Sequence, residues 1–304
     1  MPTPYCPVRM VIIRGALLGG VALACAHSTP TAEPSSDPAA AAPPALSALP
    51  LGDGKISTAP RVGYVYACQT TFGGNGAPAG KAPWIVGTSW DQTAKPTVQG
   101  AVYWPTSRLT ITLQGTDRVV SANNLPTHAT GIFPIQRSDP VYQYDANPNT
   151  IAEQSVLLRL AASPRAATVP TCVGQGMIGF TVSGAALYNA LDGAGRDAAA
   201  HEVQDACSGH PQGVGQYHYH SWSTCFSDPA GAQGRHSDLV GYALDGYGVF
   251  GQYGEGGTML TNAQLDDCHG HTHAVSWEGQ PTTIYHYHMT REYPYSVGCY
   301  HGVR

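Results

Sequence analysis

The sequence contains few charged side chains, and lysine is especially scarce. Charged residues make up 12% of the chain, against roughly 25% in average soluble domains. Only three of the 304 residues are lysine, and the formal net charge is −5. A protein that coats nucleic acid needs a basic surplus to bind phosphates. The composition therefore excludes this class, and nucleic acid is not an expected partner.

Long apolar runs and common catalytic motifs are also missing. Beyond the N-terminus, no apolar run approaches the roughly 20 residues that span a bilayer. The sequence has no G-x-S-x-G elbow, H-E-x-x-H helix, phosphate loop or C-x-x-C pair, so it matches none of the classes that these motifs mark. Its five methionines are unpaired, which argues against a methionine-rich Cu(I) site.

Glycine, proline and tyrosine are abundant instead. The chain has 36 Gly and 24 Pro, and its 17 Tyr outnumber its 5 Phe. Alternating apolar residues predict a strand over residues 108–113, with further strands over 118–120 and 155–160. Helix signals are limited to residues 196–204 and a single turn over 261–266. We therefore expect a mainly β fold with short helices.

The first 25 residues have the pattern of an export signal. Arg9 and Arg14 precede an apolar stretch over residues 15–24 that ends in small residues. Its end, Ala22-Leu23-Ala24-Cys25, is similar to a bacterial lipoprotein processing site, which would place a lipid on Cys25. Ordinary signal cleavage before Cys25 is the alternative. We expect an exported protein that is lipid-anchored in the cell envelope, or otherwise periplasmic or secreted. A mass measurement of the mature N-terminus that shows an unmodified Cys25 would refute lipidation.

Residues 26–58 are predicted to form a disordered tether. They are rich in alanine and proline and have few large apolar side chains whose burial would offset the entropy of ordering. No comparable break follows residue 60, so residues 59–304 are predicted to form a single domain. Membrane contact is expected only through the lipid anchor.

The second half of the chain contains an internal repeat. Asp205-x-Cys207-x-Gly209-His210 aligns with Asp266-x-Cys268-x-Gly270-His271, and Tyr217–His220 aligns with Tyr285–His288. Residues 178–184 align with 240–246 in the same order. Two copies are too few for a solenoid. We expect two pseudo-symmetric repeats, about 172–225 and 239–299, that face one another.

Six cysteines follow the leader, and their even number predicts disulfides in an oxidising compartment. The repeat favours one bond inside each copy and leaves one further pair. The predicted disulfides are Cys207–Cys225, Cys268–Cys299 and Cys68–Cys172.

The histidines carry the candidate chemistry, because eleven of the thirteen lie after residue 200. Residues i and i+2 of a strand share a face, so each His-x-His pair presents two imidazoles on the side opposite the tyrosines. Imidazoles so placed can converge on one copper or zinc ion. With a third histidine from each copy, the predicted ligands are His210, His218 and His220, and His271, His286 and His288. One shared site and two separate sites both fit the sequence.

Other polar residues complete this interpretation. Asp205, Asp266 and Asp245 are candidate acceptors that orient imidazole N–H groups. The histidines without a partner in the repeat are expected mostly at the surface: His128, His201, His236 and His301. The alternative for the whole set is a polar structural core in which tyrosine hydroxyls and imidazoles bond one another.

These motifs resemble those of the YHYH-domain proteins. The resemblance rests on both YHYH tetrapeptides, on residues 241–247, 265–268 and 293–299, and on Leu125–His128 and Ile178-Gly179. It covers about residues 100–304. It implies an exported, disulfide-bonded and often membrane-associated bacterial protein, and it implies no particular reaction.

The residues support three functional hypotheses. The first, our working hypothesis, is an extracytoplasmic protein that binds copper or zinc through the repeated histidines. The second is a metal-dependent hydrolase or oxidase at the same site. The third is a non-catalytic surface or interaction module with a structural His–Tyr core. The sequence identifies neither catalytic residues nor a protein partner.

Overall fold

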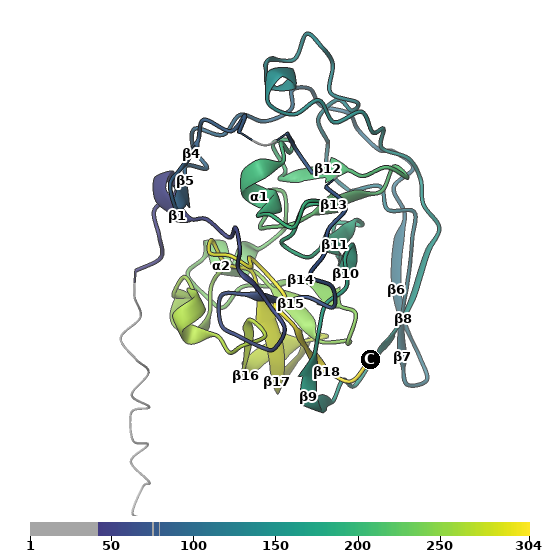
Figure 1. Cartoon of the computed structure of the whole chain (residues 1–304). Coiled ribbons are helices and arrows are strands. Elements are labelled where there is room, and N and C mark those ends of the chain that lie inside the picture. Colours follow the sequence, from purple (N-terminus) through teal and green to yellow (C-terminus); the bar gives the residue numbers. More distant parts are fainter. Residues whose placement is uncertain (1–41, 75, 79) are drawn as a thin grey trace, which may run out of the picture. The chain divides into compact units, whose positions relative to one another are not determined.

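The computed structural model describes residues 42–74, 76–78 and 80–304 (Figure 1). The predicted leader with Cys25, and the predicted tether up to residue 41, lie outside the described residues. Within the described part of the chain, no helix has the length and apolar character needed to cross a bilayer.

The largest sheet has eight strands in the order β12-β13-β11-β10-β14-β15-β17-β16. From either edge towards the centre, the pairings are antiparallel, parallel and antiparallel. Its strands are β10 (Met177–Thr181), β11 (Ala186–Tyr188), β12 (Gly209–Pro211), β13 (Tyr217–Tyr219), β14 (Leu239–Ala243), β15 (Gly248–Phe250), β16 (Gly270–Trp277) and β17 (Gln280–His288).

The two central strands, β10 and β14, run antiparallel with Phe180 opposite Tyr242. These two residues occupy the same place in the aligned sequence copies. A twofold rotation about this pair would exchange β10 with β14 and each outer strand with the strand at the same distance on the other side. Gly179 and Gly241 flank the pair. A Cβ atom on either glycine would lie 2.7 Å from a carbonyl oxygen of the facing strand. The close approach of β10 and β14 therefore requires glycine at both positions.

Four small sheets surround this one. A three-stranded sheet has the order β6-β7-β8, another has the order β1-β5-β4, and β2-β3 and β18-β9 form pairs. Their strands are β1 (Leu49–Pro50), β2 (Ile56–Ser57), β3 (Val65–Tyr66), β4 (Ile85–Val86), β5 (Ser89–Trp90), β6 (Leu109–Gln114), β7 (Asp117–Ala122), β8 (Val156–Ala161), β9 (Ala166–Thr171) and β18 (Tyr300–Gly302). The helices are α1 (Ala198–His201), α2 (Pro229–Ala232) and the 3-10 turns Leu46–Ala48, Pro140–Gln143, Glu255–Gly257 and Asn262–Gln264.

Each face of the eight-stranded sheet packs against a separate core. On one face, Phe180 and Phe250 pack against Val120 and Leu160 of the β6–β8 sheet, which lies beside the central strands in Figure 1. On the other face, a larger core includes the tyrosines of both YHYH segments. Both faces are therefore covered, and side chains pointing to either face at the sheet centre are removed from water.

Arg118 of β7 joins the β6–β8 sheet to the large sheet. Its side chain has no exposed surface, and its guanidinium lies 2.6 Å from the Glu278 carboxylate. It also donates to the carbonyl oxygen of Gly246 at 3.2 Å and packs over the rings of Tyr242 and Trp277. Burying an arginine side chain costs several kcal/mol unless its guanidinium is paired in this way.

The mainly β fold and the three disulfides confirm the sequence predictions. The disulfides are Cys68–Cys172, Cys207–Cys225 and Cys268–Cys299. The strands predicted over 108–113, 118–120 and 155–160 correspond to β6, β7 and β8. The helix predicted over 196–204 is shorter, because only Ala198–His201 is α-helical.

The predicted tether is wrong in its second part, because residues 46–58 are folded. Leu49 in β1 is 1% exposed and pairs with Trp90 of β5. The backbone N–H of Gly52 donates to the Asp197 carboxylate at 2.8 Å. The composition of this segment did not predict that it folds, because its contacts are made with residues far along the chain.

Asp197, which caps the N-terminus of α1, is a buried carboxylate with an altered pKa. Burial raises its pKa to about 6, against the ordinary value of 3.8, although a hydrogen bond from the Tyr295 hydroxyl lowers it. The native state therefore keeps a proton that the unfolded state loses near pH 4. The stability from this group is fully present below the unfolded pKa and is lost as the pH rises through about 6.

Asp197→Asn is expected to remove this pH dependence. The wild type should lose up to about 3 kcal/mol of unfolding free energy relative to the variant between roughly pH 3.5 and 7. Urea unfolding of both proteins across this range measures the difference. A difference that stays constant with pH would show that Asp197 titrates equally in both states.

Candidate metal centres

The YHYH segments place histidines and tyrosines on opposite faces of the eight-stranded sheet. In β13, His218 lies beside Ala186 in the register and Tyr219 lies beside Leu187. The third histidine of each copy lies opposite the first histidine of the tetrapeptide, His210 against His218 and His271 against His286. Strand alternation and cross-strand pairing together bring three imidazoles of each copy to one face.

The loop that leads into each third histidine has the same hydrogen bonds in both copies. Asp205 Oδ1 accepts from the backbone N–H groups of Cys207 and Gly209, and the Tyr217 hydroxyl donates to the carboxylate at 2.9 Å. Asp266 Oδ1 accepts from the equivalent groups: Cys268 N–H, Gly270 N–H and the Tyr285 hydroxyl. Each aspartate thus fixes its loop and one tyrosine of the tetrapeptide.

The glycine before each third histidine is required by the same tyrosine. A Cβ atom on Gly209 would lie 2.2 Å from the Tyr217 ring, and one on Gly270 would lie 2.3 Å from the Tyr285 hydroxyl. The tyrosine rings therefore pack directly on the backbone beside His210 and His271.

Backbone carbonyls, and not the aspartates, orient the imidazoles of the tetrapeptides. Nδ1 of His218 lies 3.1 Å from the oxygen of Gln216, and Nδ1 of His220 lies 2.5 Å from that of Asn189. The second copy repeats this, with His286 against Ile284 at 3.0 Å and His288 against Gly251 at 2.6 Å. A carbonyl oxygen only accepts, so Nδ1 carries the proton and Nε2 keeps its lone pair.

The structure thus differs from the prediction that Asp205, Asp266 and Asp245 hold the imidazoles. All three point to the tyrosine face. Asp245 Oδ2 accepts from the Tyr287 hydroxyl at 2.5 Å, and in the first copy Ser183 takes that place, 2.9 Å from the Tyr219 hydroxyl. These polar side chains satisfy buried tyrosine hydroxyls.

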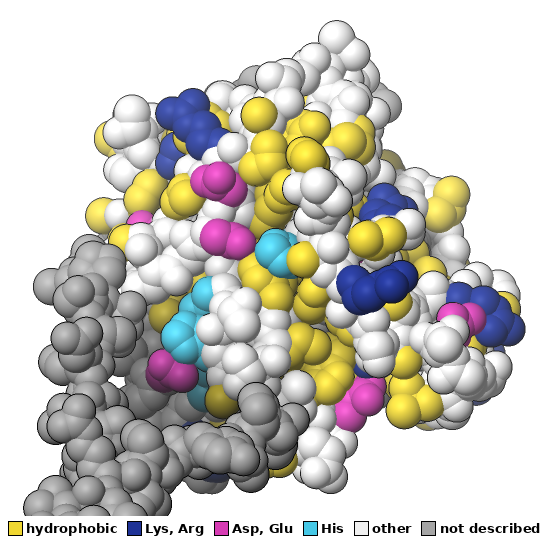
Figure 2. Space-filling view, turned by 90° about the horizontal axis from the view of Figure 1, so that it is seen from below, with side chains coloured by type: hydrophobic (Ala, Val, Ile, Leu, Met, Phe, Trp, Pro, Cys, Tyr) yellow, Lys and Arg dark blue, Asp and Glu magenta, His cyan; other side chains and the backbone are white. Residues whose placement is uncertain are grey.

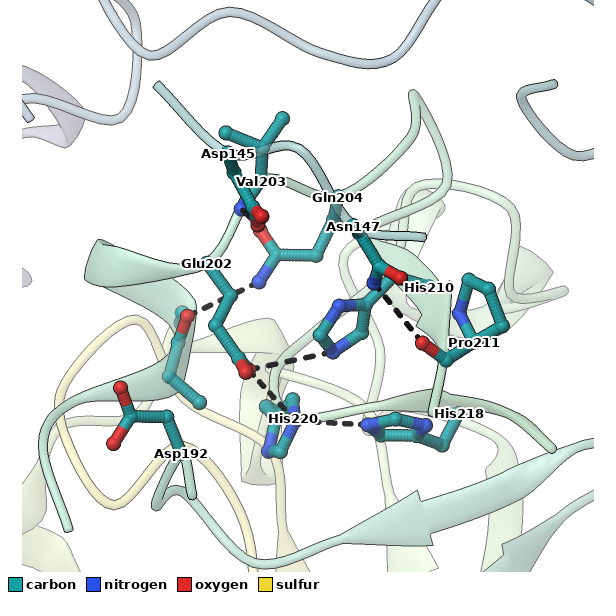
Figure 3. Close-up of polar contacts among 12 residues, drawn as sticks. Asp145, Asn147, Asp192, Glu202, Val203, Gln204, His210, Pro211, His218 and His220 are labelled. Carbon is teal, nitrogen blue, oxygen red and sulfur yellow. Dashed lines mark hydrogen bonds and ion pairs between the residues drawn. The ribbon is translucent and has the colours of Figure 1, made fainter. Parts of the chain in front are cut away.

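The first cluster, which we call site 1, consists of His210, His218 and His220. One ring nitrogen from each lies within 4.8 Å of the others, and all three side chains are buried. The Nε2 atoms of His218 and His220 face each other at 3.1 Å (Figure 3). Ligand nitrogens about 2.0–2.1 Å from a tetrahedral ion are roughly 3.3 Å apart, so this spacing suits metal coordination.

Glu202 lies against site 1. Its Oε2 is 3.4 Å from the Nε2 atoms of both His210 and His220. Figure 3 draws both contacts as dashed lines. Neither Oε2 nor either ring nitrogen of His210 has a hydrogen-bond partner in the described structure. Burial raises the pKa of Glu202 well above its ordinary value. Buried polar atoms are almost always paired, so this group of unpaired atoms is exceptional.

Burial also keeps the imidazoles of site 1 neutral. It lowers the pKa of His220 to about 4, and it lowers the pKa of His218 well below its usual range, with the neighbouring His220 adding to the effect. Near neutral pH, two unprotonated Nε2 atoms therefore face each other without a proton to share. A cation between them would relieve this contact.

The second cluster, site 2, consists of four histidines: His236, His271, His286 and His288. The Nε2 atoms of His236 and His286 are 3.2 Å apart, and Nε2 of His271 and of His288 have no hydrogen-bond partner among the described residues. Burial lowers the pKa of His286 to about 4. His271 is half-buried, and Figure 2 shows that histidine side chains do reach the surface beside acidic ones.

The six predicted ligands therefore divide into two clusters of three. The sequence did not point to two further side chains, His236 and Glu202, that lie at these clusters. His236 had been assigned to the surface, but its Nδ1 is 2.8 Å from the Ser237 oxygen and its Nε2 faces site 2. Glu202 directly follows α1, and no sequence motif marks it as part of a site. Neither residue has an equivalent in the other copy, so the repeat could not reveal them.

The other three histidines predicted at the surface are half-buried, and each ring contacts a neighbouring side chain. Nε2 of His128 lies 2.6 Å from the Tyr219 hydroxyl, and His201 pairs with Asp53 at 2.9 Å. His301 stacks on Tyr285 with ring centroids 3.7 Å apart. His128 also lies near Cys207 and Cys225, but both sulfurs are held in a disulfide and are not free to bind a metal.

Comparison with known proteins supports the family resemblance. The model of the family described as "YHYH protein" matches residues 157–263, which include the first tetrapeptide and end before the second. No curated protein and no solved structure matches the chain. The histidine-bearing tetrapeptide of site 1 lies inside the matched segment. The chain therefore carries a YHYH domain over the matched residues 157–263.

Proposed function

We propose that this protein binds a copper or zinc ion at each of its two histidine clusters, outside the cytoplasm. One observation carries the proposal: in both copies, backbone carbonyls hold Nδ1 of the two tetrapeptide histidines, so that their Nε2 lone pairs converge with a nitrogen of the third histidine. This is how proteins orient histidine ligands of a metal ion. In a purely structural core, the buried nitrogens would be paired with donors.

The ligand chemistry favours copper or zinc over other ions. Both sites supply imidazole nitrogens, which suit these metals, and among the described residues neither cluster includes a cysteine thiolate. Calcium and magnesium prefer sets of oxygen ligands. At site 1, the Glu202 carboxylate lies 3.4 Å from two of the imidazoles, and one oxygen ligand is too few for those ions.

Metal titration of chelator-treated protein tests the proposal. We expect about two ions of Cu²⁺ or Zn²⁺ per chain, with stabilisation of about 2.7 kcal/mol per site at a free metal concentration 100 times the dissociation constant. Isothermal calorimetry and the thermal midpoint measure the two effects. Absence of both binding and a thermal shift would support the structural His–Tyr core instead.

A metal-dependent enzyme is the second candidate, and the pocket beside site 1 favours it. This pocket has a volume of about 760 Å³ and is lined by all three histidines of site 1 and by Glu202. A metal held there would be open to a small molecule. No residue is assigned a catalytic role.

We further propose export with lipid attachment at Cys25. The three disulfides support an oxidising compartment. The sequence around Cys25 supports the lipid, which would hold the metal-binding domain at a membrane surface.

A further inference from the structure

The two sites differ in what lies next to them. The pocket of about 760 Å³ includes all three histidines of site 1. A pocket of about 550 Å³ near site 2 includes His236 but none of the other three histidines. Molecules entering the first pocket can therefore reach the convergence point of the imidazoles of site 1.

The two sites also differ in their number of ligands. Site 2 has four imidazoles whose nitrogens all lie within 4.8 Å of one another, whereas site 1 has three. The Glu202 carboxylate is not part of that mutually close set, and it lies to the side of His210 and His220. Four protein ligands close a tetrahedral ion, whereas three leave a position for water or another molecule.

The pocket at site 1 is lined by several polar side chains. Its acidic side chains are Asp145, Asp192 and Glu202, and its lining includes no lysine or arginine. Asp192 is paired with Arg196 at 2.6 Å, and the buried ammonium of Lys95 also acts on Glu202 and on two of the imidazoles. Amide side chains at Asn147, Asn149, Gln175 and Gln212 add hydrogen-bonding groups. These hydrogen-bonding groups suit a small polar molecule as the ligand that enters the pocket.

From these differences we infer that site 1 is an open metal centre and site 2 is a closed one. The fourth ligand at site 1 is exchangeable: water, or an uncharged polar molecule bound from the pocket. Oε2 of Glu202 accepts a hydrogen bond from that ligand, which satisfies the unpartnered carboxylate oxygen. This inference rests on the proposed metal binding and assigns the two sites different roles.

Imidazole binding to Cu²⁺-loaded single-site variants tests the inference. His286→Ala with His288→Ala leaves site 1, and His218→Ala with His220→Ala leaves site 2. We expect imidazole to shift the Cu²⁺ electron paramagnetic resonance and visible spectra of the first variant saturably, and to leave those of the second unchanged. Circular dichroism checks folding, and metal content after desalting shows that copper is retained.

Two further variants make the test specific. In the His218→Ala, His220→Ala variant, which keeps only site 2, His236→Ala would remove one of the four ligands. This opens a coordination position on the ion, so the spectra of this protein should begin to respond to imidazole. A bound Cu²⁺ ion favours the ionised form of Glu202 in the variant that keeps only site 1. Glu202→Gln in this variant removes that negative charge, so it should raise the affinity for azide about tenfold without strengthening imidazole binding.

The possible failures are distinguishable. If neither single-site variant binds copper, the proposed function itself is wrong. If both bind copper but respond equally to imidazole, or only site 2 responds, the assignment of open and closed centres is wrong. An azide affinity unchanged by Glu202→Gln would overturn the role of that carboxylate. If a double variant misfolds, His220→Gln or His288→Gln alone in the full chain replaces it, and the same spectra decide.

Discussion

Replacing His218 and His220 together with alanine is expected to lower the metal bound from about two ions per chain to about one. Both side chains belong to site 1 and neither contributes to site 2. Only His210 would remain of the three imidazoles, and a single imidazole does not hold an ion against dialysis. Elemental analysis of desalted protein measures the loss.

The matched variants for this experiment come from the same chain. His286→Ala with His288→Ala should remove the other ion, and all four substitutions together should remove both. His201→Ala is the control, since His201 pairs with Asp53 outside either cluster. Metal content that is unchanged in the His218/His220 variant, with the disulfides intact, would contradict the assignment of site 1.

Replacing Asp205 with alanine should cause the largest loss of stability among the polar residues around site 1. Its carboxylate accepts from the backbone N–H groups of Gly131, Cys207 and Gly209 and from the Tyr217 hydroxyl. Each buried donor left without a partner costs about 1–3 kcal/mol, and water entering the space recovers part of this. We expect a loss of about 3–5 kcal/mol in the free energy of unfolding, measured by urea denaturation.

Asp205→Asn is the conservative comparison. The amide keeps one accepting oxygen, so we expect it to lose less stability than alanine. Because Asp205 contacts tyrosine and backbone and not imidazole, folded Asp205→Ala protein should still bind about two metal ions. A variant of full stability that had lost one ion would instead show that Asp205 orients a ligand.

Local sequence patterns predicted the parts of the site that depend on one strand or one repeat. Alternation placed His218 and His220 on one face, and the repeat pointed to the third imidazole and to the disulfides Cys207–Cys225 and Cys268–Cys299. These features need only strand geometry and the equivalence of two copies. They could therefore be predicted from the sequence without knowledge of the tertiary structure.

The remaining groups of the sites depend on contacts between distant segments. Glu202 reaches site 1 from the end of α1, and His236 reaches site 2 from the loop before β14. The role of the aspartates was missed for a related reason: a carboxylate near a histidine in sequence can bond either face of the strand. Here, the buried tyrosine hydroxyls are its partners. The folding of residues 46–58 likewise depends on distant partners such as Asp197.

The central claim is that the converging Nε2 atoms hold metal ions, and anomalous X-ray scattering from crystals soaked in Cu²⁺ or Zn²⁺ tests it most directly. We predict one peak among His210, His218 and His220 and another among His236, His271, His286 and His288, each roughly 2.0–2.1 Å from its nitrogens. Maps with no peak at either cluster, and with water molecules between the imidazoles in place of metal, would contradict the account.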